Sequence, residues 1–279
     1  MSRIEDKFQA LRQKGEKALI PFVAAGDPSP ETTLRLMRIL AAAGADVVEL
    51  GVPFSDPVAD GPVNQAAYYR ALNRGVTPAD VLSMVADFRA ENETPVALLT
   101  YYNPIFQSGC DRFASQAAAS GVDGVIVVDL PVEEAAEWIS ACRSHGVDSV
   151  FLAAPTSSAA RIKLIAENST GFIYCVSRTG VTGARHRLPP DLERMIAGIR
   201  ATTPKPLAVG FGISTPDQVE QVCRVADGAI VGSAIVEIIA VGAGEEQMAE
   251  RVAGFVSELK SATRPAAGEK VLPSGANPI

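Results

Sequence analysis

Two carboxylates near each other in the sequence are the first candidates for chemistry. Glu49 lies inside the apolar run VVELG, and Asp60 lies in the Pro-rich loop that follows it, GVPFSDPVADGP. A carboxylate inside an apolar strand is costly to bury, so Glu49 needs either a function or a partner. The alternative for Glu49 is a structural carboxylate that accepts hydrogen bonds from backbone N–H groups. For Asp56 and Asp60, each taken alone, the alternative is an ordinary solvated loop acid.

Glycine-rich segments near the carboxyl end of the chain are a second signal. GFGIS closes the apolar run 206–214, and GSAI opens a short helix at Ser233. In α/β barrels the loops after strands seven and eight, together with the N-terminus of a short helix, form a phosphate site. Gly212 and Gly232 would let backbone N–H groups approach phosphate oxygens, and the Ser233 hydroxyl would donate a hydrogen bond. Each glycine alone also fits a plain tight turn, but their joint placement indicates a phosphorylated ligand.

Two other kinds of catalysis lack the residues that they need. A Schiff-base aldolase requires a lysine inside the barrel, and no lysine of this sequence lies at the carboxyl end of a candidate strand. A metal-dependent aldolase requires clustered ligands, whereas the only histidines are His145, expected at a helix end, and His186, expected in a solvated loop. No metal site is therefore expected, and acid–base catalysis by carboxylates remains.

The elements that must position these residues follow a repeating pattern. Short apolar runs alternate with amphipathic stretches of helical length from residue 18 to about residue 240, as in βα units around a parallel sheet. The candidate strands span residues 18–26, 46–51, 95–102, 124–131, 148–155, 171–177, 206–214 and 228–234. An open doubly wound sheet would give the same local pattern. Because nearly every run ends in Gly, Pro, Ser or a carboxylate, and barrel strands converge at their carboxyl ends, the sequence favours a single (β/α)8 TIM barrel.

The segments outside the repeat complete the expected domain. Residues 2–15 predict an extra N-terminal helix at the amino-terminal mouth of the barrel, and residues 245–261 predict a last amphipathic helix. The catalytic barrel is expected over residues 1–262, with residues 263–279 as a disordered tail rich in Pro and Gly. The Gly- and Thr-containing segment 177–187 is expected to act as a mobile lid.

Composition and charge exclude several partners. The chain has 279 residues, a net charge of -7 and no block of Lys and Arg, so it lacks the basic surface that nucleic-acid binding requires. It shows no long apolar span and no signal peptide, so a cytoplasmic protein without a membrane anchor is expected. The four cysteines form no CxxC pair and are expected to be buried, reduced thiols: Cys110, Cys142, Cys175 and Cys223.

Several segments taken together resemble the tryptophan synthase alpha family. They are PFVAAGDPSPE, ELGVPFSDPVADGPVNQ, YYNPIF, FIYCVSRTGVTGAR and GFGIS. The resemblance runs from about residue 2 to residue 260, and the ELGVPFSDPVADGP loop is its most specific part because it is long and unusual in composition. The sequence departs at Asn64, where a Thr, Ile or similar residue is more familiar, and at TYYNP, which replaces a MYAN-like run.

The resemblance implies a carbon–carbon lyase of tryptophan biosynthesis that cleaves indole-3-glycerol phosphate into indole and glyceraldehyde 3-phosphate. It implies Glu49 and Asp60 as the catalytic pair, with Tyr174 in support. The substrate-binding residues that it implies are Phe22, Leu99, Tyr101 and Phe211 around the indole, Gly183, Gly212, Gly232 and Ser233 around the phosphate, and Thr182. It also implies a beta subunit that carries pyridoxal phosphate and receives indole in an α2β2 heterotetramer, so that this chain needs no cofactor of its own.

The chemistry of the two acids agrees with this resemblance. Breaking the bond between indole C3 and the side chain would expel an unstable carbanion, so C3 must first be protonated. Glu49 can donate that proton and then accept one from the adjacent side-chain hydroxyl, while Asp60 stabilises the charge that develops at the indole nitrogen. Two alternatives are another phosphate-binding barrel, such as an isomerase or epimerase, and a silent barrel that only activates a partner. The first should lack the Asp60 loop, and the second has no chemical reason to keep Glu49.

The same loop is also the expected partner contact. A purely catalytic loop needs only Asp60, so the stiff apolar remainder around Phe54 suggests a docking surface whose ordering also positions that carboxylate. A rigid lid that needs no partner is the alternative.

Overall fold

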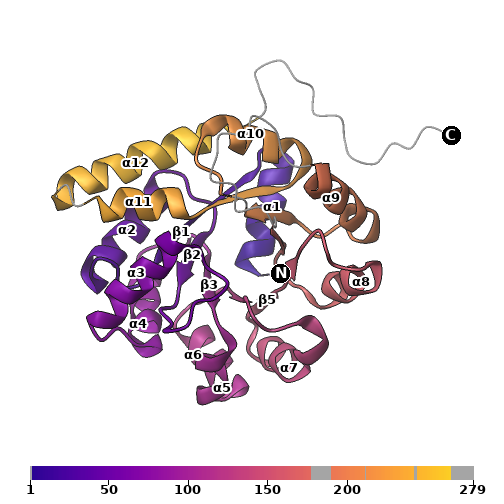
Figure 1. The fold of residues 1–279 in the computed structure, drawn as a ribbon, viewed down its shortest axis with the longest axis horizontal. Coiled ribbons are helices and arrows are strands. Elements are labelled where there is room, and N and C mark those ends of the chain that lie inside the picture. The colour runs from indigo at the N-terminus through magenta and orange to yellow at the C-terminus, as the bar shows by residue number, and fades with distance from the viewer. Residues whose placement is uncertain (1, 177–189, 211, 242–243, 265–279) are drawn as a thin grey trace.

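Nine parallel strands form a sheet that is ringed by helices (Figure 1). The computed structural model describes residues 2–176, 190–210, 212–241 and 244–264. The strand order is β5-β4-β3-β2-β1-β9-β8-β7-β6. Its two ends, β5 (Asp148–Val150) and β6 (Leu152–Ala153), are separated only by Phe151, so the sheet closes through one stretch of chain. The predicted (β/α)8 barrel is confirmed, with the single strand expected over 148–155 present as two short strands.

The elements follow the predicted order. The remaining strands are β1 (Ala18–Ala24), β2 (Val48–Gly51), β3 (Val96–Thr100), β4 (Gly124–Val127), β7 (Ile173–Val176), β8 (Leu207–Gly210) and β9 (Gly228–Val231). The helices are α1 (Arg3–Lys14), α2 (Pro30–Ala42), α3 (Pro62–Asn73), α4 (Pro78–Arg89), α5 (Tyr102–Ser108), α6 (Cys110–Ala119), η1 (Val132–Glu134), α7 (Ala136–His145), α8 (Ala159–Asn168), α9 (Pro190–Thr202), α10 (Pro216–Val225), α11 (Ser233–Ala240) and α12 (Glu245–Ser261). Most strands are shorter than the apolar runs; β2 ends with its run at Gly51, whereas the run 228–234 continues into the start of α11.

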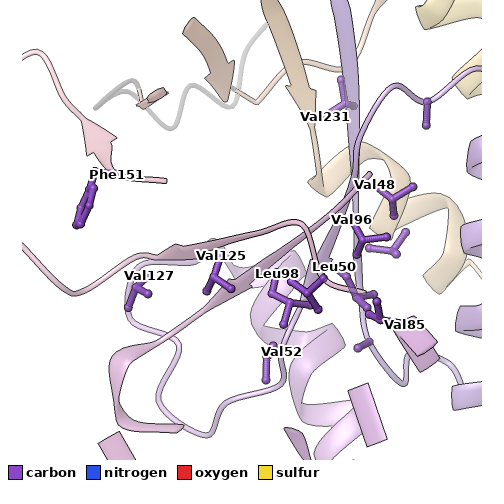
Figure 2. Close-up of a cluster of buried hydrophobic side chains, with 14 of the residues drawn as sticks. Val48, Leu50, Val52, Val85, Val96, Leu98, Val125, Val127, Phe151 and Val231 are labelled. Carbon is purple, nitrogen blue, oxygen red and sulfur yellow. The ribbon is translucent and has the colours of Figure 1, made fainter. Parts of the chain in front are cut away.

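Each strand is apolar on both faces because one face packs against the surrounding helices and the other face packs into the barrel interior. Successive side chains of a strand point to opposite faces of the sheet. On β2, Val48 and Leu50 belong to the outer layer between the sheet and its helices, which Figure 2 shows around β2, β3 and β4. On the neighbouring strands, Ile20 and Ala97 belong to the separate cluster inside the barrel. The near-continuous apolar runs therefore reflect a sheet that is buried on both sides.

Helix α1 covers the amino-terminal mouth of the barrel, as the sequence predicts (Figure 1). Ser2 and Glu5 form a capping box that fixes the start of this helix. Ile4 is fully buried, and a Cβ on Gly124 would lie only 2.9 Å from its Cδ1 atom. Close packing between the helix and the start of β4 therefore favours glycine at position 124.

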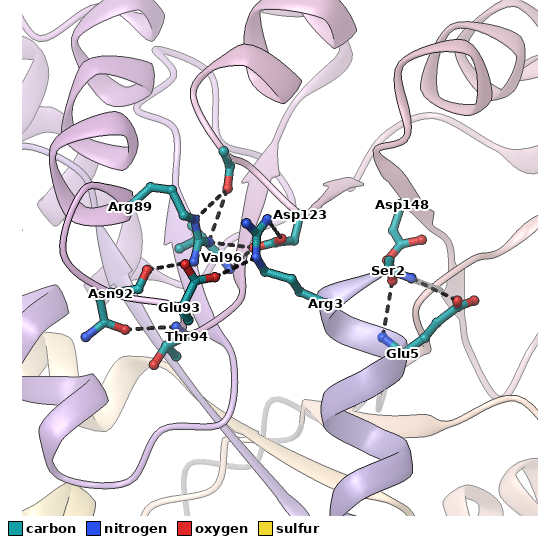
Figure 3. A network of polar contacts seen from close by, with 11 residues as sticks. Ser2, Arg3, Glu5, Arg89, Asn92, Glu93, Thr94, Val96, Asp123 and Asp148 are labelled. Carbon is teal, nitrogen blue, oxygen red and sulfur yellow. Dashed lines mark hydrogen bonds and ion pairs between the residues drawn. The ribbon is translucent and has the colours of Figure 1, made fainter.

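A polar network holds this end of the barrel together (Figure 3). The buried Asp123 accepts a hydrogen bond from the Val96 backbone N–H at 2.8 Å and one from Arg89 Nη2 at 2.7 Å. Arg3 of α1 reaches the second oxygen of Asp123 at 3.2 Å and Glu93 at 2.9 Å. The network joins α1 to the segments around β3 and β4, so it contributes to stability at the end of the barrel opposite the strand carboxyl ends.

A buried ion pair attaches the last helix to the first strands. Lys260 of α12 donates to Asp46 Oδ2 at 2.8 Å, and that oxygen also accepts the Leu19 backbone N–H at 2.8 Å. Both side chains are almost fully buried. Replacing Lys260 by Met is expected to lower the free energy of unfolding by about 3 kcal/mol, because the Asp46 charge stays buried without its cation. Urea denaturation at pH 7 would measure the loss.

The exposed pair of Lys163 and Glu167, at 3.9 Å, offers a matched control. Lys163→Met is expected to change the free energy of unfolding by less than about 0.5 kcal/mol, since exposed ion pairs contribute little. Equal effects of the two lysine variants would contradict a structural role for the buried pair.

Candidate active site

Glu49 lies inside the barrel because of the alternation along β2. The residue pairs with Phe22 on β1 and with Ala97 on β3, two residues that belong to the cluster inside the barrel. Its side chain is 1% exposed. The adjacent Val48 and Leu50 point outward into the layer beneath the helices. The strand therefore carries one carboxylate into an otherwise apolar interior.

The surroundings of Glu49 favour its neutral form. Burial, with a smaller contribution from the negative charge of Asp60, raises the pKa of Glu49 to about 8. Its Oε2 atom has no hydrogen-bond partner among the residues that the structure describes. Among those residues, therefore, no backbone donor satisfies this oxygen as the structural alternative would require. A carboxyl group with this pKa can donate a proton near neutral pH and accept one afterwards.

Asp60 is held by two side chains rather than left in solvent. Tyr101 donates its hydroxyl hydrogen to Asp60 Oδ2 at 2.6 Å, and Asn64 donates from Nδ2 to Oδ1 at 3.3 Å. Burial raises the pKa of Asp60, and these two hydrogen bonds oppose that rise. The alternative of a solvated loop acid is thus wrong for Asp60, whereas it holds for the exposed Asp56.

Tyr101 has a position that the sequence did not reveal. The resemblance implied only that its ring lines the pocket, but its hydroxyl also accepts a hydrogen bond from the Ala59 backbone N–H at 3.0 Å. Phe54 stacks on the same ring, with 5.0 Å between the ring centroids. This one side chain therefore attaches both the backbone and the carboxylate of the Asp60 loop to the end of β3.

Tyr174 points into the barrel from β7 towards the two acids. Burial, and then the charges of Glu49 and Asp60, raise the pKa of Tyr174 well above its ordinary value, so its hydroxyl stays protonated. On the adjacent strand, a Cβ on Gly210 would lie 2.5 Å from the Tyr174 hydroxyl. Gly210 is therefore needed at this position for the tyrosine to fit, a requirement that the sequence alone did not show.

The predicted anion site lies at the carboxyl ends of β8 and β9, which are neighbours in the sheet. Gly232 is the N-cap of α11, where no side chain provides a capping hydrogen bond. The helix starts at Ser233, as predicted, and has no acidic residue in its first turn. Gly212 has a backbone φ of 56°, a conformation that favours glycine. A helix N-terminus beside a glycine turn can bind a phosphate through its backbone N–H groups.

The remaining predicted residues divide between the interior and the undescribed segments. Phe22 and Leu99 are buried in the cluster inside the barrel, as expected for an indole pocket. Thr182, Gly183 and Phe211 lie outside the residues that the structure describes, as do the predicted lid and nearly all of the predicted tail. Their assignments stay predictions.

The lysine and histidine side chains suited to other chemistry have structural partners where the structure describes them. Lys205 donates to the backbone oxygen of Ala166 at 2.6 Å, and His145 ends α7 beside Asp111 at 2.8 Å. No cluster of metal-binding side chains occurs in the described part of the chain. Three of the cysteines are buried, as predicted, whereas Cys223 is only partly buried; all four are free thiols. Within the described ranges no helix is both long and apolar enough to cross a membrane.

A barrel that carries a buried acid, a second acid and a glycine-framed helix N-terminus at the carboxyl ends of its strands defines an acid–base enzyme of the TIM-barrel class. Comparison with known families is specific. The profile described as "Tryptophan synthase alpha chain" matches residues 8–264. The chain therefore belongs to the tryptophan synthase alpha chain family.

Individual relatives agree with this assignment. The tryptophan synthase alpha chain of Geobacter sp. strain M21 is 50% identical over 260 residues, which cover 93% of this chain and 97% of the relative. The crystal structure of tryptophan synthase subunit alpha from Legionella pneumophila str. Paris is 42% identical, with a TM-score of 0.87, and the match covers 94% of this chain and 98% of that one. A structure of the tryptophan synthase a2b2 complex from Pyrococcus furiosus is 40% identical, with a TM-score of 0.83 over 88% of this chain and 99% of that one.

Proposed function

We propose that the carboxyl end of this barrel cleaves indole-3-glycerol phosphate with Glu49 as the acid and base. Alpha chains of tryptophan synthase are carbon–carbon lyases that release indole and glyceraldehyde 3-phosphate from this substrate, and this chain is one of them. The observation that carries the residue assignment is the buried carboxyl of Glu49, whose pKa is raised to about 8 beside Asp60. A carboxyl group with a strongly raised pKa inside a hydrophobic barrel is more readily explained by a catalytic role than by a structural one.

Glu49 acts twice in the proposed sequence. Its neutral carboxyl first protonates indole C3, which turns the ring into an indolenine that can accept the electrons of the breaking bond. The resulting carboxylate then takes the proton of the adjacent side-chain hydroxyl, and the carbon–carbon bond breaks to leave an aldehyde. Indole and glyceraldehyde 3-phosphate result, and Glu49 ends in its neutral form. Glu49 thus donates one proton and receives one proton in each turnover, so the reaction needs no other proton donor or acceptor.

Asp60 stabilises the intermediate in which the indole ring is positively charged. Its carboxylate accepts a hydrogen bond from the indole N–H, and Tyr101 and Asn64 hold it in one orientation for that purpose. Tyr174 supports the acids from the opposite side of the barrel. The apolar side chains of Phe22 and Leu99 exclude water and strengthen both electrostatic interactions.

The ligand contacts divide into two groups. Phe22, Leu99, Tyr101 and Phe211 surround the indole. Gly183, Gly212, Gly232 and Ser233 bind the phosphate, and Thr182 also contacts the substrate. Phe22 and Leu99 come from interior strand positions, whereas Gly232 and Ser233 start a helix, so one end of the substrate meets apolar side chains and the other meets N–H donors.

A beta subunit is the partner of this chain, in an α2β2 assembly of the kind described for Pyrococcus furiosus. The Asp60 loop is the proposed contact, since Val58 within it is 83% exposed although it is apolar. Pyridoxal phosphate belongs to the beta subunit, and this chain needs no cofactor of its own. The localisation that we propose is the cytoplasm.

The direct test is release of indole when the purified chain is mixed with indole-3-glycerol phosphate. A phosphate-binding isomerase or epimerase would convert a different substrate and release no indole. A silent barrel would release no indole alone and would still raise the activity of the beta subunit. Measuring both reactions separates the three possibilities.

The anion site gives a separate prediction. Gly232→Asp places a carboxylate where the phosphate is expected, and Gly232 has space for a side chain because the nearest atoms to its Cβ, those of Phe22, would lie at 3.5 Å or more. Repulsion between the two anions is expected to weaken binding of indole-3-glycerol phosphate by about 100-fold. Binding of free indole should change little. Gly254→Asp, at an open position of α12, is the control that adds the same charge elsewhere. Equal weakening of both ligands would show that the phosphate binds at another place.

A further inference from the structure

Helix α3 presents two polar side chains to the acids, one turn apart. Asn64 and Tyr68 are spaced i, i+4 and therefore lie on the same face of the helix. Asn64 reaches Asp60, as described above. Tyr68 is fully buried, and its ring packs edge-on against Phe22 with centroids 6.5 Å apart. Neither residue was predicted to belong to the site.

The Tyr68 hydroxyl lies beside β2, close to Glu49. A Cβ on Gly51 would lie 2.6 Å from this hydroxyl, and Gly51 follows Glu49 by two residues on the same face of the strand. The charges of Asp60 and Glu49 contribute to raising the pKa of Tyr68 well above its ordinary value, after burial itself. The hydroxyl is thus a protonated, buried donor among the acids.

Three buried polar atoms at this place have no hydrogen-bond partner in the described part of the chain: Glu49 Oε2, Asn64 Oδ1 and the Tyr68 hydroxyl. The amide of Asn64 is oriented by Asp60, which as a carboxylate only accepts, so its free atom is the carbonyl oxygen. The set therefore offers two acceptors and one hydroxyl donor. Leaving buried polar atoms unpaired is costly, and such groups commonly share one ordered water that makes about three hydrogen bonds.

We propose that one water molecule, held by the Tyr68 hydroxyl and the Asn64 carbonyl, donates a hydrogen bond to Glu49 Oε2 and makes Tyr68 a positioning residue for the acid. The water accepts the Tyr68 hydrogen and donates its own two hydrogens to the Asn64 and Glu49 oxygens. This arrangement satisfies all three atoms and rests on the proposed role of Glu49. It stabilises the carboxylate form, and so lowers the pKa of Glu49 towards neutrality from the value that burial alone would set.

Tyr68→Phe tests this water directly, because it removes the hydroxyl and keeps the ring. Turnover requires neutral Glu49 at its first step, so kcat for indole release should fall as pH rises through the pKa of Glu49. Loss of a hydrogen bond to the carboxylate should move this alkaline limb to higher pH by about one unit. Tyr102→Phe is the control, since within the described residues that hydroxyl forms its hydrogen bond with the Cys110 thiol, at 3.7 Å, and the alkaline limb of this variant should not move.

A second variant separates a shared water from two independent effects. Asn64→Leu removes the second holder of the water together with its hydrogen bond to Asp60, and it should also move the alkaline limb upward. The double variant with Tyr68→Phe should move the limb no further than Asn64→Leu alone, since both variants lack Asn64 and the water is already released. A crystal structure of the unsubstituted chain should show a water within hydrogen-bond distance of all three atoms. Additive shifts, or an unmoved limb in folded Tyr68→Phe, would overturn the proposal.

The outcome also differs from a failure of the proposed function. If the unsubstituted chain releases no indole, the lyase assignment fails before any variant is compared. If it releases indole and Tyr68→Phe has the same pH profile, only the water is refuted. Thermal unfolding of each variant confirms that the compared proteins are folded.

Discussion

Glu49→Gln is expected to lower the rate of indole release by at least about 10²–10⁴-fold, the usual effect of removing a general acid and base. The amide keeps the shape of the neutral carboxyl, so indole-3-glycerol phosphate should still bind with nearly unchanged affinity. Steady-state release of indole and equilibrium binding of the substrate measure the two quantities. Glu134→Gln, at an exposed position of η1, is the control. Near-normal turnover of Glu49→Gln would refute the mechanism.

The same variant has a second expected property, which follows from linkage. The pKa of Glu49 is raised from 4.5 to about 8 in the folded chain, so the unfolded state gains more from ionisation as pH rises above 4.5. Glutamine removes that gain, and Glu49→Gln should therefore be more stable than the unsubstituted chain, increasingly so from pH 5 to about 8. An inactive but stabilised variant excludes unfolding as the cause of lost turnover.

Asp60→Asn is expected to reduce turnover by about 10²–10³-fold, the range seen when one preorganised electrostatic contact is removed. The neutral amide cannot stabilise a positive indole ring, and its amide hydrogens would meet the Tyr101 hydroxyl, which now donates to Asp60. Tyr101→Phe keeps the carboxylate and removes the hydrogen bonds of the Tyr101 hydroxyl with Asp60 and with the Ala59 N–H, so its loss should be smaller. Rates of indole release by both variants, at a pH where Glu49 is neutral, provide the comparison. A larger loss in Tyr101→Phe would contradict the assignment of the charge to Asp60.

The strand positions were predictable because each strand is apolar on both faces. A parallel barrel buries both sides of its sheet, so each strand appears in the sequence as a continuous run of apolar residues, and a polar residue of the following loop marks the end of that run. Glu49 stands out for the same reason, since it is a carboxylate in the middle of such a run that the alternation directs inward. The interruption at Phe151 was not predictable, because it depends on how the last pairing partners align when the sheet closes.

The support around the acids was only partly predictable. The resemblance identified Asp60 as a catalytic residue. Its hydrogen bond with Tyr101 depends on how the loop folds back onto β3, and the spacing of the two residues in the sequence does not predict this fold. Asn64 and Tyr68 share a helix face by their spacing, yet nothing in the sequence says that this face meets the barrel interior. The glycines at 51 and 210 are needed only because particular rings lie against them. Such requirements arise from tertiary packing.

The pairing of β1 with β9 has a consequence for synthesis on the ribosome. Ala18 pairs with Gly228, so one edge of the first strand has no partner until most of the chain has been made. Unpaired strand edges readily pair with other chains, and long-range strand pairing is slow. Nascent chains that end before residue 228 are therefore aggregation-prone, and a chaperone that covers the exposed edge of β1 would protect them. Codon changes that slow translation between β4 and β9 would lengthen this exposed period and lower the yield of folded protein without altering a single amino acid.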